Sequence, residues 1–243
     1  MPTYRLDLAY DGSGFHGYAR QPQVRTVQGE LEEALFKLVG VVATEVAGRT
    51  DAGVHAQGQV VSFSVDGELD TERLVRSLNA MLGPEIVVWS ARQEADGFSA
   101  RFSARSRTYR YSVLNRPLPD PFLRYTTWHL ADELFLDAMN EAARFFVGEH
   151  DFASFCRSAD GRSTVRQVLT AGWEGAQPPI VRFEITAGSF CHQMVRSGVA
   201  VCVEVGRGRL PVSEVPAIIE ARDRAAARGA APPHGLTLWK VEY

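Results

Sequence analysis

The chain has 243 residues, of which 45% are hydrophobic and 23% are charged, and its formal net charge is −3. This length allows one large domain or two small ones, and the composition excludes a disordered or fibrous protein. The most apolar stretch, Ser197–Val205, is far shorter than the ~20 residues that a membrane span needs. We therefore expect no membrane segment.

The cysteines are Cys156, Cys191 and Cys202, which are odd in number and widely spaced. This pattern predicts neither a zinc site nor a disulfide framework, and it favours a reducing cytoplasm. The first residues contain no basic segment followed by an apolar core, so we expect no secretory signal.

Alternating polarity, helix caps and glycine-rich breaks divide the first half into short elements. The predicted strands are 4–10, 41–46, 59–65, 86–91 and 98–103. One helix is predicted to begin at Thr26 and another to span 71–82. Glycines in 11–17 indicate a loop after the first strand.

The second half repeats the same kinds of element. Its predicted strands are 107–114, 164–174, 180–186 and 236–243, and its predicted helices are 132–147, 190–205 and 212–228. Similar orders in the two halves predict an α+β protein of two pseudo-symmetric halves, with antiparallel or mixed sheets and helices on one side. We place the first half at 1–105 and the second at 106–243.

The segment AGRTDAGVHA, residues 47–56, has the composition of a loop that presents a carboxylate. Asp51 is the candidate catalytic group, because Arg49 beside it favours the ionised carboxylate that such a role requires. An ordinary turn, in which the Asp51 side chain bonds to its own backbone, is the alternative.

Arginines alternate with aromatic residues in FSARFSARSRTYRY, residues 98–111. Arginines bind phosphates and aromatic rings stack on bases, so this stripe, extended to Arg124, predicts an RNA-binding surface with Arg105 and Arg107 as phosphate contacts. A half-exposed strand with charged outer residues is the alternative.

Arg196 follows an apolar stretch, so we expect it to have a carboxylate partner, either at a site or in an ion pair with Glu204. His192 nearby is expected to be a packed or surface residue. The glycine-rich segment 10–23 lacks both phosphate-loop patterns, so it gives only weak support to a nucleotide site. Recognition of a ligand by the polar loop and a plain connection both remain open. No His or Cys cluster has metal-ligand spacing.

The ordered set YDGSGFHGYARQPQ, GRTDAGVHA, FSARFSARSRTYRY and GSFCHQMVRSGV resembles the tRNA pseudouridine synthase A family over nearly the whole chain. One departure is that residues 17–21 read Gly-Tyr-Ala-Arg-Gln, where the family has Gly-Trp-Gln-x-Gln. The change bears on RNA contacts there rather than on the reaction.

The resemblance implies the roles of particular residues. Asp51 matches the catalytic aspartate, and Tyr109 matches the tyrosine that packs on the target base. Arg49 matches the motif arginine that holds the site and the flipped nucleotide, and Arg196 the basic residue that pairs with the aspartate. We add His55 as a substrate-binding residue.

The resemblance also implies a homodimer without metal or cofactor, a central RNA-binding cleft, and isomerisation of uridines 38, 39 and 40 in the tRNA anticodon stem-loop. Two other functions remain open from the residues alone. One is a non-catalytic RNA-binding module that uses the stripe 101–124. The other is a glycoside-processing enzyme, which would need a second acid near Asp51; Glu45 is close in sequence but is expected to face solvent.

Overall fold

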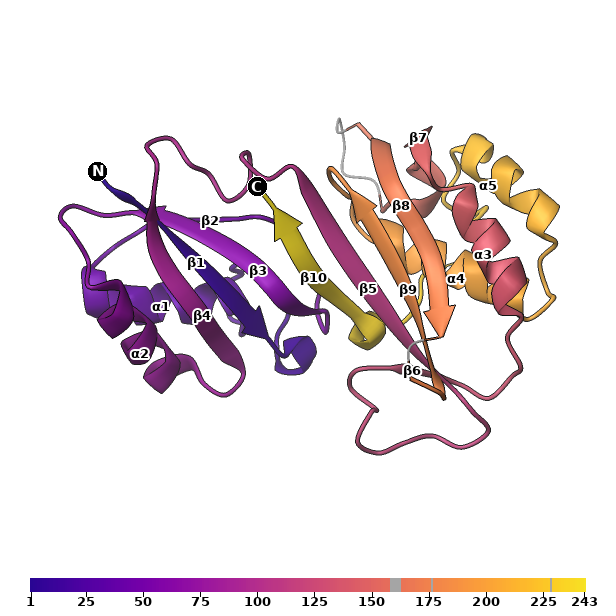
Figure 1. Cartoon of the computed structure of the whole chain (residues 1–243), viewed down its shortest axis with the longest axis horizontal. Coiled ribbons are helices and arrows are strands. Elements are labelled where there is room, and N and C mark those ends of the chain that lie inside the picture. Colours follow the sequence, from indigo (N-terminus) through magenta and orange to yellow (C-terminus); the bar gives the residue numbers. More distant parts are fainter. Residues whose placement is uncertain (158–162, 176, 228) are drawn as a thin grey trace. The chain divides into compact units, whose positions relative to one another are not determined.

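The computed structural model describes residues 1–157, 163–175, 177–227 and 229–243 (Figure 1). They form two compact units: Met1–Arg107 with Thr237–Tyr243, called unit 1, and Thr108–Leu236, called unit 2. The C-terminal strand therefore belongs to the unit that contains Asp51. This corrects our expectation that residues 106–243 form the second half.

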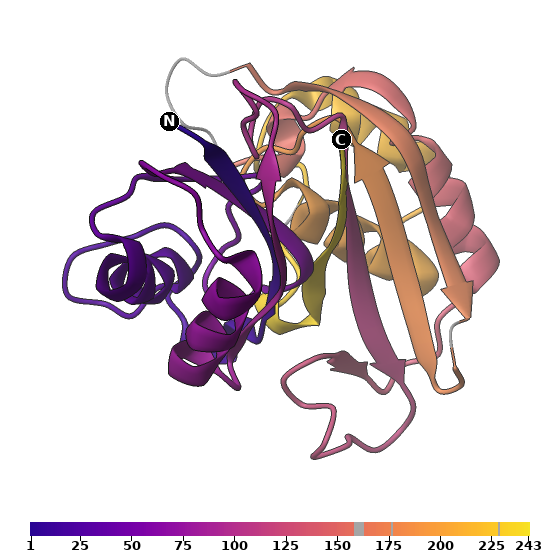
Figure 2. The same ribbon diagram turned by 60° about the vertical axis from the view of Figure 1, so that its left-hand side comes forward.

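Unit 1 is a sheet with two helices on one face (Figures 1 and 2). Its strands are β1 (Thr3–Tyr10), β2 (Thr44–Val46), β3 (His55–Ser64), β4 (Ile86–Glu94) and β10 (Leu236–Glu242). Its helices are α1 (Val27–Val39), α2 (Thr71–Leu82) and the short 3-10 helix η1 (Gly12–Gly14).

The strand order in unit 1 is β4–β1–β3–β10, and β2 pairs with β3. β1 is antiparallel to both of its neighbours, whereas β10 runs parallel to β3, with Thr237 opposite His55. Because β10 pairs with β3, it belongs to unit 1 although the chain reaches it only after passing through unit 2.

Local sequence signals account for the elements of unit 1. β1 alternates, with Leu6 and Leu8 fully buried on the helix-covered face. α1 begins where the Thr26 hydroxyl accepts a hydrogen bond from Gly29 N, and α2 where Asp70 accepts one from Arg73 N. Both are N-caps, which satisfy backbone donors that a helix leaves free.

Unit 2 is a sheet of order β5–β9–β8–β7, with β6 beside β5. Its strands are β5 (Ser106–Asn115), β6 (Trp128–Leu130), β7 (Gly148–Asp151), β8 (Val165–Gly175) and β9 (Ile180–Ala187). Its helices are α3 (Leu136–Arg144), α4 (Met194–Gly206), α5 (Val215–Ala221) and the short η2 (Ala153–Phe155), η3 (Val212–Glu214) and η4 (Pro233–Gly235).

The core of unit 2 lies between its sheet and helix α4. Most of α4 is buried, as its continuous apolar sequence predicts. Phe146, Phe155 and Phe183 fill the space beside it, each no more than 2% exposed. Gly198 of α4 allows Phe146 to approach closely, since a Cβ there would lie 3.3 Å from the ring.

The α+β class predicted from the sequence is confirmed, and several element predictions are wrong. Residues 98–103 form a turn rather than a strand. The two helices predicted over 132–147 and 212–228 are shorter, and α5 ends before Arg222, which has a left-handed backbone with φ of 50°. Residue 228 lies outside the described residues. The short strands β6 and β7 were not predicted.

Among the described residues, no helix is both long and apolar enough to cross a membrane.

Candidate active site

The loop that carries Asp51 connects β2 to β3 in unit 1. Its backbone is fixed at both ends: Ala47 N donates to Val60 O at 2.9 Å, and Val54 N donates to Asp51 O at 3.1 Å. Asp51 is half-buried and Arg49 is exposed. The loop therefore holds the backbone of the candidate carboxylate in a defined place.

The glycine-rich loop 11–17 packs directly against the Asp51 loop. A Cβ on Gly12 would lie 2.1 Å from Val54 O, which no side chain permits. Gly17 has φ of +94°, and a Cβ there would lie 3.0 Å from Thr50 O. Tyr18 N donates to the same Thr50 carbonyl at 3.0 Å. The glycines predicted only as a loop thus allow one chain segment to support the other.

His55 is buried at the start of β3, with 7% of its surface exposed. Its Nδ1 accepts a hydrogen bond from Gly12 N at 3.0 Å. That contact joins the two loops, so the geometry favours a structural role for His55 over the substrate contact that we expected.

Arg105 and Arg107 differ although both were predicted to contact phosphates. Arg105 is exposed. Arg107 is 9% exposed, and its guanidinium donates to Ala47 O at 3.0 and 2.9 Å, to Ala104 O at 3.2 Å and to Arg101 O at 2.7 Å. The geometry favours a role for Arg107 in anchoring the start of the Asp51 loop rather than in binding phosphate.

Sequence reasoning missed two buried polar residues beneath this loop, Tyr10 and Gln59. The Tyr10 hydroxyl lies 2.7 Å from Thr50 Oγ1, and Gln59 Nε2 donates to Gly48 O at 2.7 Å. Burial raises the pKa of Tyr10 to about 12. β3 contains other polar residues as well, including Gln57, so no local signal distinguishes Gln59.

Tyr18 occupies the position where the family pattern has tryptophan. It is fully buried, and its hydroxyl has no hydrogen-bond partner among the described residues. Burial raises the pKa of Tyr18 well above its ordinary value. The departure therefore changes a buried packing position, where it leaves a polar atom unsatisfied.

Tyr109 and Arg196 lie in unit 2. The Tyr109 ring is 8% exposed and packs edge-on against Phe190, with ring centroids 5.0 Å apart. Arg196 is half-buried on α4, and its Nε donates to Ala231 O at 2.7 Å. Glu204, which was considered as an ion-pair partner for Arg196, instead contacts Arg207 at 3.1 Å.

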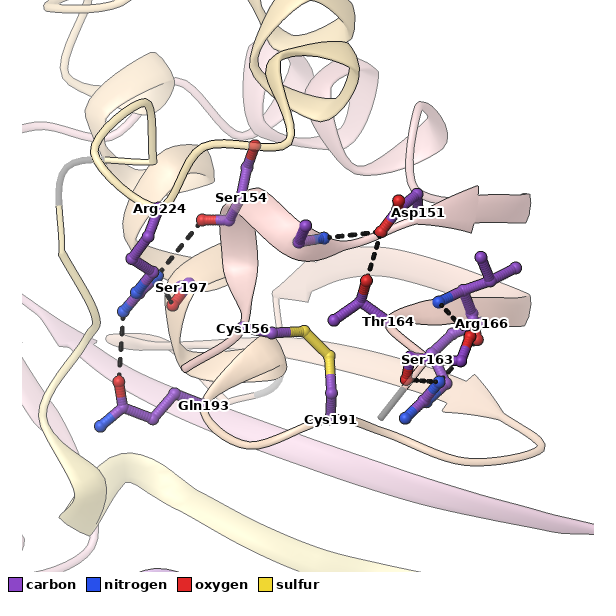
Figure 3. The surroundings of a disulfide bond; sticks show 12 residues. Asp151, Ser154, Cys156, Ser163, Thr164, Arg166, Cys191, Gln193, Ser197 and Arg224 are labelled. Atoms are coloured by element: carbon purple, nitrogen blue, oxygen red, sulfur yellow. Dashed lines mark hydrogen bonds between the residues drawn. A yellow bond between two sulfur atoms is a disulfide. The ribbon is translucent and has the colours of Figure 1, made fainter. Parts of the chain in front are cut away.

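The structure joins Cys156 to Cys191 in a disulfide, whereas the sequence predicted no disulfide (Figure 3). The two residues are 35 positions apart with a Cα–Cα distance of 5.7 Å, so only the fold brings them together. Cys202 is free and buried.

Arg224 supports the segment that follows the disulfide. Its guanidinium donates to Ser197 Oγ at 2.7 Å and to Gln193 Oε1 at 3.2 Å, as Figure 3 shows. These contacts and the disulfide fix the chain on both sides of the entry to α4. Phe190 directly precedes Cys191, so the disulfide also supports the packing surface of Tyr109.

The predicted site residues therefore occupy two units. Unit 1 contains Arg49, Asp51, His55, Arg105 and Arg107, and unit 2 contains Tyr109 and Arg196. In the described part of the chain, no group of three or more His, Cys, Asp or Glu side chains could hold a metal ion.

Comparison with known proteins identifies the family. The family model described as tRNA pseudouridine synthase matches residues 8–103 and 142–243. The chain belongs to the tRNA pseudouridine synthase family. The matched ranges include the Asp51 loop and the whole of α4, and they leave out residues 104–141.

Relatives named tRNA pseudouridine synthase A match along most of their length. The protein of Methylacidiphilum infernorum is 45% identical over 99% of this chain and 95% of its own. That of Moorella thermoacetica is 43% identical over 100% of both chains, and that of Bacillus subtilis 40% identical over 98% of both. The chain thus resembles full-length members of the family.

A solved structure, an archaeal box H/ACA sRNP Nop10–Cbf5 complex, is 14% identical over 82% of this chain and 44% of that chain, with a TM-score of 0.33. A likeness this distant has no bearing on the family assignment.

Proposed function

We propose that this chain converts uridines 38, 39 and 40 in the anticodon stem-loop of tRNA to pseudouridine, with Asp51 as the catalytic nucleophile. The observation that carries the proposal is the Asp51 loop. It lies inside the matched family region, and buried polar groups hold its backbone while Asp51 itself is half-buried.

The family determines the reaction. A tRNA pseudouridine synthase is an isomerase: the bond between N1 of uracil and C1′ of the ribose breaks, and a bond between C5 and C1′ forms. The C5 hydrogen leaves as a proton, and N1 ends with a proton. Atoms and electrons balance within the nucleotide, so the reaction requires neither an oxidant nor a transferred group.

Asp51 supplies the anionic group for a covalent step of this isomerisation. Arg49, exposed two residues earlier, is suited to hold a phosphate of the extruded nucleotide, because arginine binds phosphate in a bidentate manner. Extrusion of a base from a stem costs a few kcal/mol, which phosphate contacts of this kind can offset.

Unit 2 supplies the remaining roles. Tyr109 presents an aromatic ring, already packed against Phe190, on which the target uracil would stack. Arg196 is the basic residue proposed to pair with Asp51. Arg105 remains a proposed phosphate contact because it is exposed.

The proposal includes a homodimer that acts on tRNA in the cytoplasm. Disulfides are rare in that compartment, since cellular thiols reduce them. We therefore expect Cys156 and Cys191 to be thiols in the cell and to form the disulfide under oxidising conditions.

The test is release of tritium from tRNA labelled at C5 of uracil. The wild-type chain should release tritium, and Asp51→Asn should release none while it still binds tRNA. Glu45→Gln is the matched control, because Glu45 is an exposed carboxylate in β2, near the same loop. It should react like the wild type.

Other outcomes would change the assignment. Normal release by Asp51→Asn would refute the nucleophile. Loss of tritium release in Glu45→Gln would show that the reaction needs a second carboxylate near Asp51 and would refute the assignment of Asp51 as the sole acidic group. Binding of tRNA without release by the wild type would favour the non-catalytic RNA-binding module.

A further inference from the structure

Two buried polar side chains beneath the Asp51 loop form a hydrogen-bond network with a third, Thr50, in the loop itself. Tyr10, Thr50 and Gln59 are 4%, 7% and 0% exposed. The Tyr10 hydroxyl is 2.7 Å from Thr50 Oγ1, and Gln59 Nε2 donates to the Tyr10 oxygen at 3.2 Å and to Gly48 O at 2.7 Å. Strands β1 and β3 are thus connected to both neighbours of Arg49.

The hydrogens in this network have a defined direction. The Gln59 amide group uses its two hydrogens on Gly48 O and on the Tyr10 oxygen. The Tyr10 oxygen therefore accepts from Gln59, and its own hydrogen is available for Thr50 Oγ1. Because burial raises the pKa of Tyr10 to about 12, the hydroxyl keeps this hydrogen at neutral pH.

Packing alone does not explain a glutamine at this position. β3 buries Val60, Val61 and Phe63 next to it, and an apolar side chain would fill the same space without desolvating an amide. The donor end of the Gln59 amide contacts the loop and the hydroxyl that supports it. The polar group is therefore used to order the loop.

We propose that Tyr10 and Gln59 are positioning residues, which hold the backbone at Gly48 and Thr50 so that Asp51 is presented in one orientation. The inference rests on the proposed function, because it assigns the network to the reaction of Asp51. A misplacement of about 1 Å in a reacting group can cost about 100-fold in rate, so support on both sides of Arg49 has a direct kinetic consequence.

Tyr10→Phe removes the hydroxyl and keeps the ring. We expect kcat for tritium release to fall about 10- to 100-fold, while KM for tRNA stays within about twofold, because the variant disturbs the reacting group and leaves the RNA-binding surface intact. A protein that had merely lost stability would also show a lower apparent kcat at unchanged KM, because fewer molecules would be folded, so a control variant with the same loss of stability must separate the two cases.

Tyr4→Phe is the matched control. Tyr4 lies on the same face of β1 and is 1% exposed, and its hydroxyl accepts a hydrogen bond from Leu69 N at 2.8 Å. This variant also loses one buried tyrosine hydroxyl, but at the other end of the strand from Asp51. It should lower the melting temperature about as much as Tyr10→Phe and leave kcat unchanged.

A second pair of variants keeps the proposal testable if Tyr10→Phe does not fold. Thr50→Val removes the hydroxyl that Tyr10 contacts, whereas Thr50→Ser keeps it. We expect Thr50→Val to match Tyr10→Phe in kcat, and Thr50→Ser to recover most of the loss. The double variant Tyr10→Phe with Thr50→Val should be no slower than either single variant, because both remove the same hydrogen bond.

Equal kcat in Tyr10→Phe and Tyr4→Phe would overturn the proposal. So would a double variant in which the losses of kcat in Tyr10→Phe and Thr50→Val multiply. In both cases an active wild-type chain would leave the proposed function intact. An inactive wild-type chain would instead refute the proposed function, and this inference with it.

Discussion

Arg107 offers a sharp test of how the Asp51 loop is held. The sequence predicts that its guanidinium contacts phosphate, whereas in the structure the guanidinium donates to backbone carbonyls of unit 1. Arg107→Met keeps much of the aliphatic stem and removes the guanidinium. Four hydrogen bonds to three backbone carbonyls are lost with it.

The loss of these hydrogen bonds does not cost the same free energy at each of the three carbonyls. Ala47 is 5% exposed and its carbonyl accepts two of the four hydrogen bonds, so it would be left unsatisfied in the interior. Arg101 and Ala104 belong to a partly exposed turn, where water can replace the lost donors. With about 1–3 kcal/mol for an unsatisfied buried group, and more for a lost charged donor, we expect a loss of about 3 kcal/mol in the free energy of unfolding.

The assay is urea unfolding followed by circular dichroism, together with tRNA binding over a range of salt concentrations. Arg105→Met is the matched control, since it removes an exposed arginine two residues away. It should change stability by no more than about 0.5 kcal/mol and should weaken tRNA binding with a smaller salt dependence.

The opposite pattern would refute this reasoning. If Arg107→Met unfolds like the wild type and flattens the salt dependence of tRNA binding, the guanidinium contacts phosphate as the sequence first indicated. The hydrogen bonds to Ala47 would then contribute little to the stability of unit 1.

Three further predictions concern cysteine and tyrosine side chains. Under oxidising conditions the denatured chain should show one titratable thiol before reduction and three after it. Cys156→Ser should lower the free energy of unfolding by about 4 kcal/mol relative to the disulfide form, because the disulfide closes a loop between residues 35 positions apart and so restricts the unfolded chain. Three thiols before reduction would refute the disulfide. Burial raises the pKa of Cys202 to about 12, whereas the thiol of the unfolded chain loses its proton near pH 9. The contribution of Cys202 to the free energy of unfolding is therefore complete below pH 9 and falls by about 1.4 kcal/mol per pH unit as the pH rises from 9 towards 12. In urea unfolding between pH 8 and 11, the free energy of unfolding should fall less steeply with pH for Cys202→Ala than for the wild type. An equal fall in both would contradict the raised pKa of Cys202. Tyr18→Phe removes a hydroxyl without a partner in the described residues, so calorimetry should show a stability equal to the wild type or higher by about 1 kcal/mol.

Much of the fold could be predicted because its signals are local. α2 has the bounds that its Asp70 cap and leucine spacing indicate, and β1 follows its alternating pattern. The turn at 98–103 was missed because the Ser99 hydroxyl accepts from the backbone N–H groups of Arg101 and Phe102. Such hydrogen bonds from the backbone to a side chain compete with strand pairing, and the hydrophobic pattern of the sequence does not reveal them.

The candidate site was predictable only in part for a related reason. The residues of the Asp51 loop are adjacent in sequence and form a recognisable motif. The support beneath them comes from β1 and β3, which pair with a register shift between Leu8 and Tyr10. Arg105 and Arg107 are chemically identical, and only the fold determines which of them is buried. Interactions between distant strands decide these points, and the local sequence does not contain them.

The pairing of β10 with β3 affects the order in which the chain can fold during synthesis. Unit 1 contains the Asp51 loop, yet one edge of its sheet is completed by Thr237–Tyr243, where the Tyr243 hydroxyl also donates to Ala100 O. The whole of unit 2 must leave the ribosome before that edge is covered. At roughly 5–20 residues per second the delay is on the order of 10 s. During this time β2 covers residues 61–63 of β3, but His55 and Ala56 on the same edge stay unpaired, so a nascent chain stalled in unit 2 would be the form most prone to aggregation.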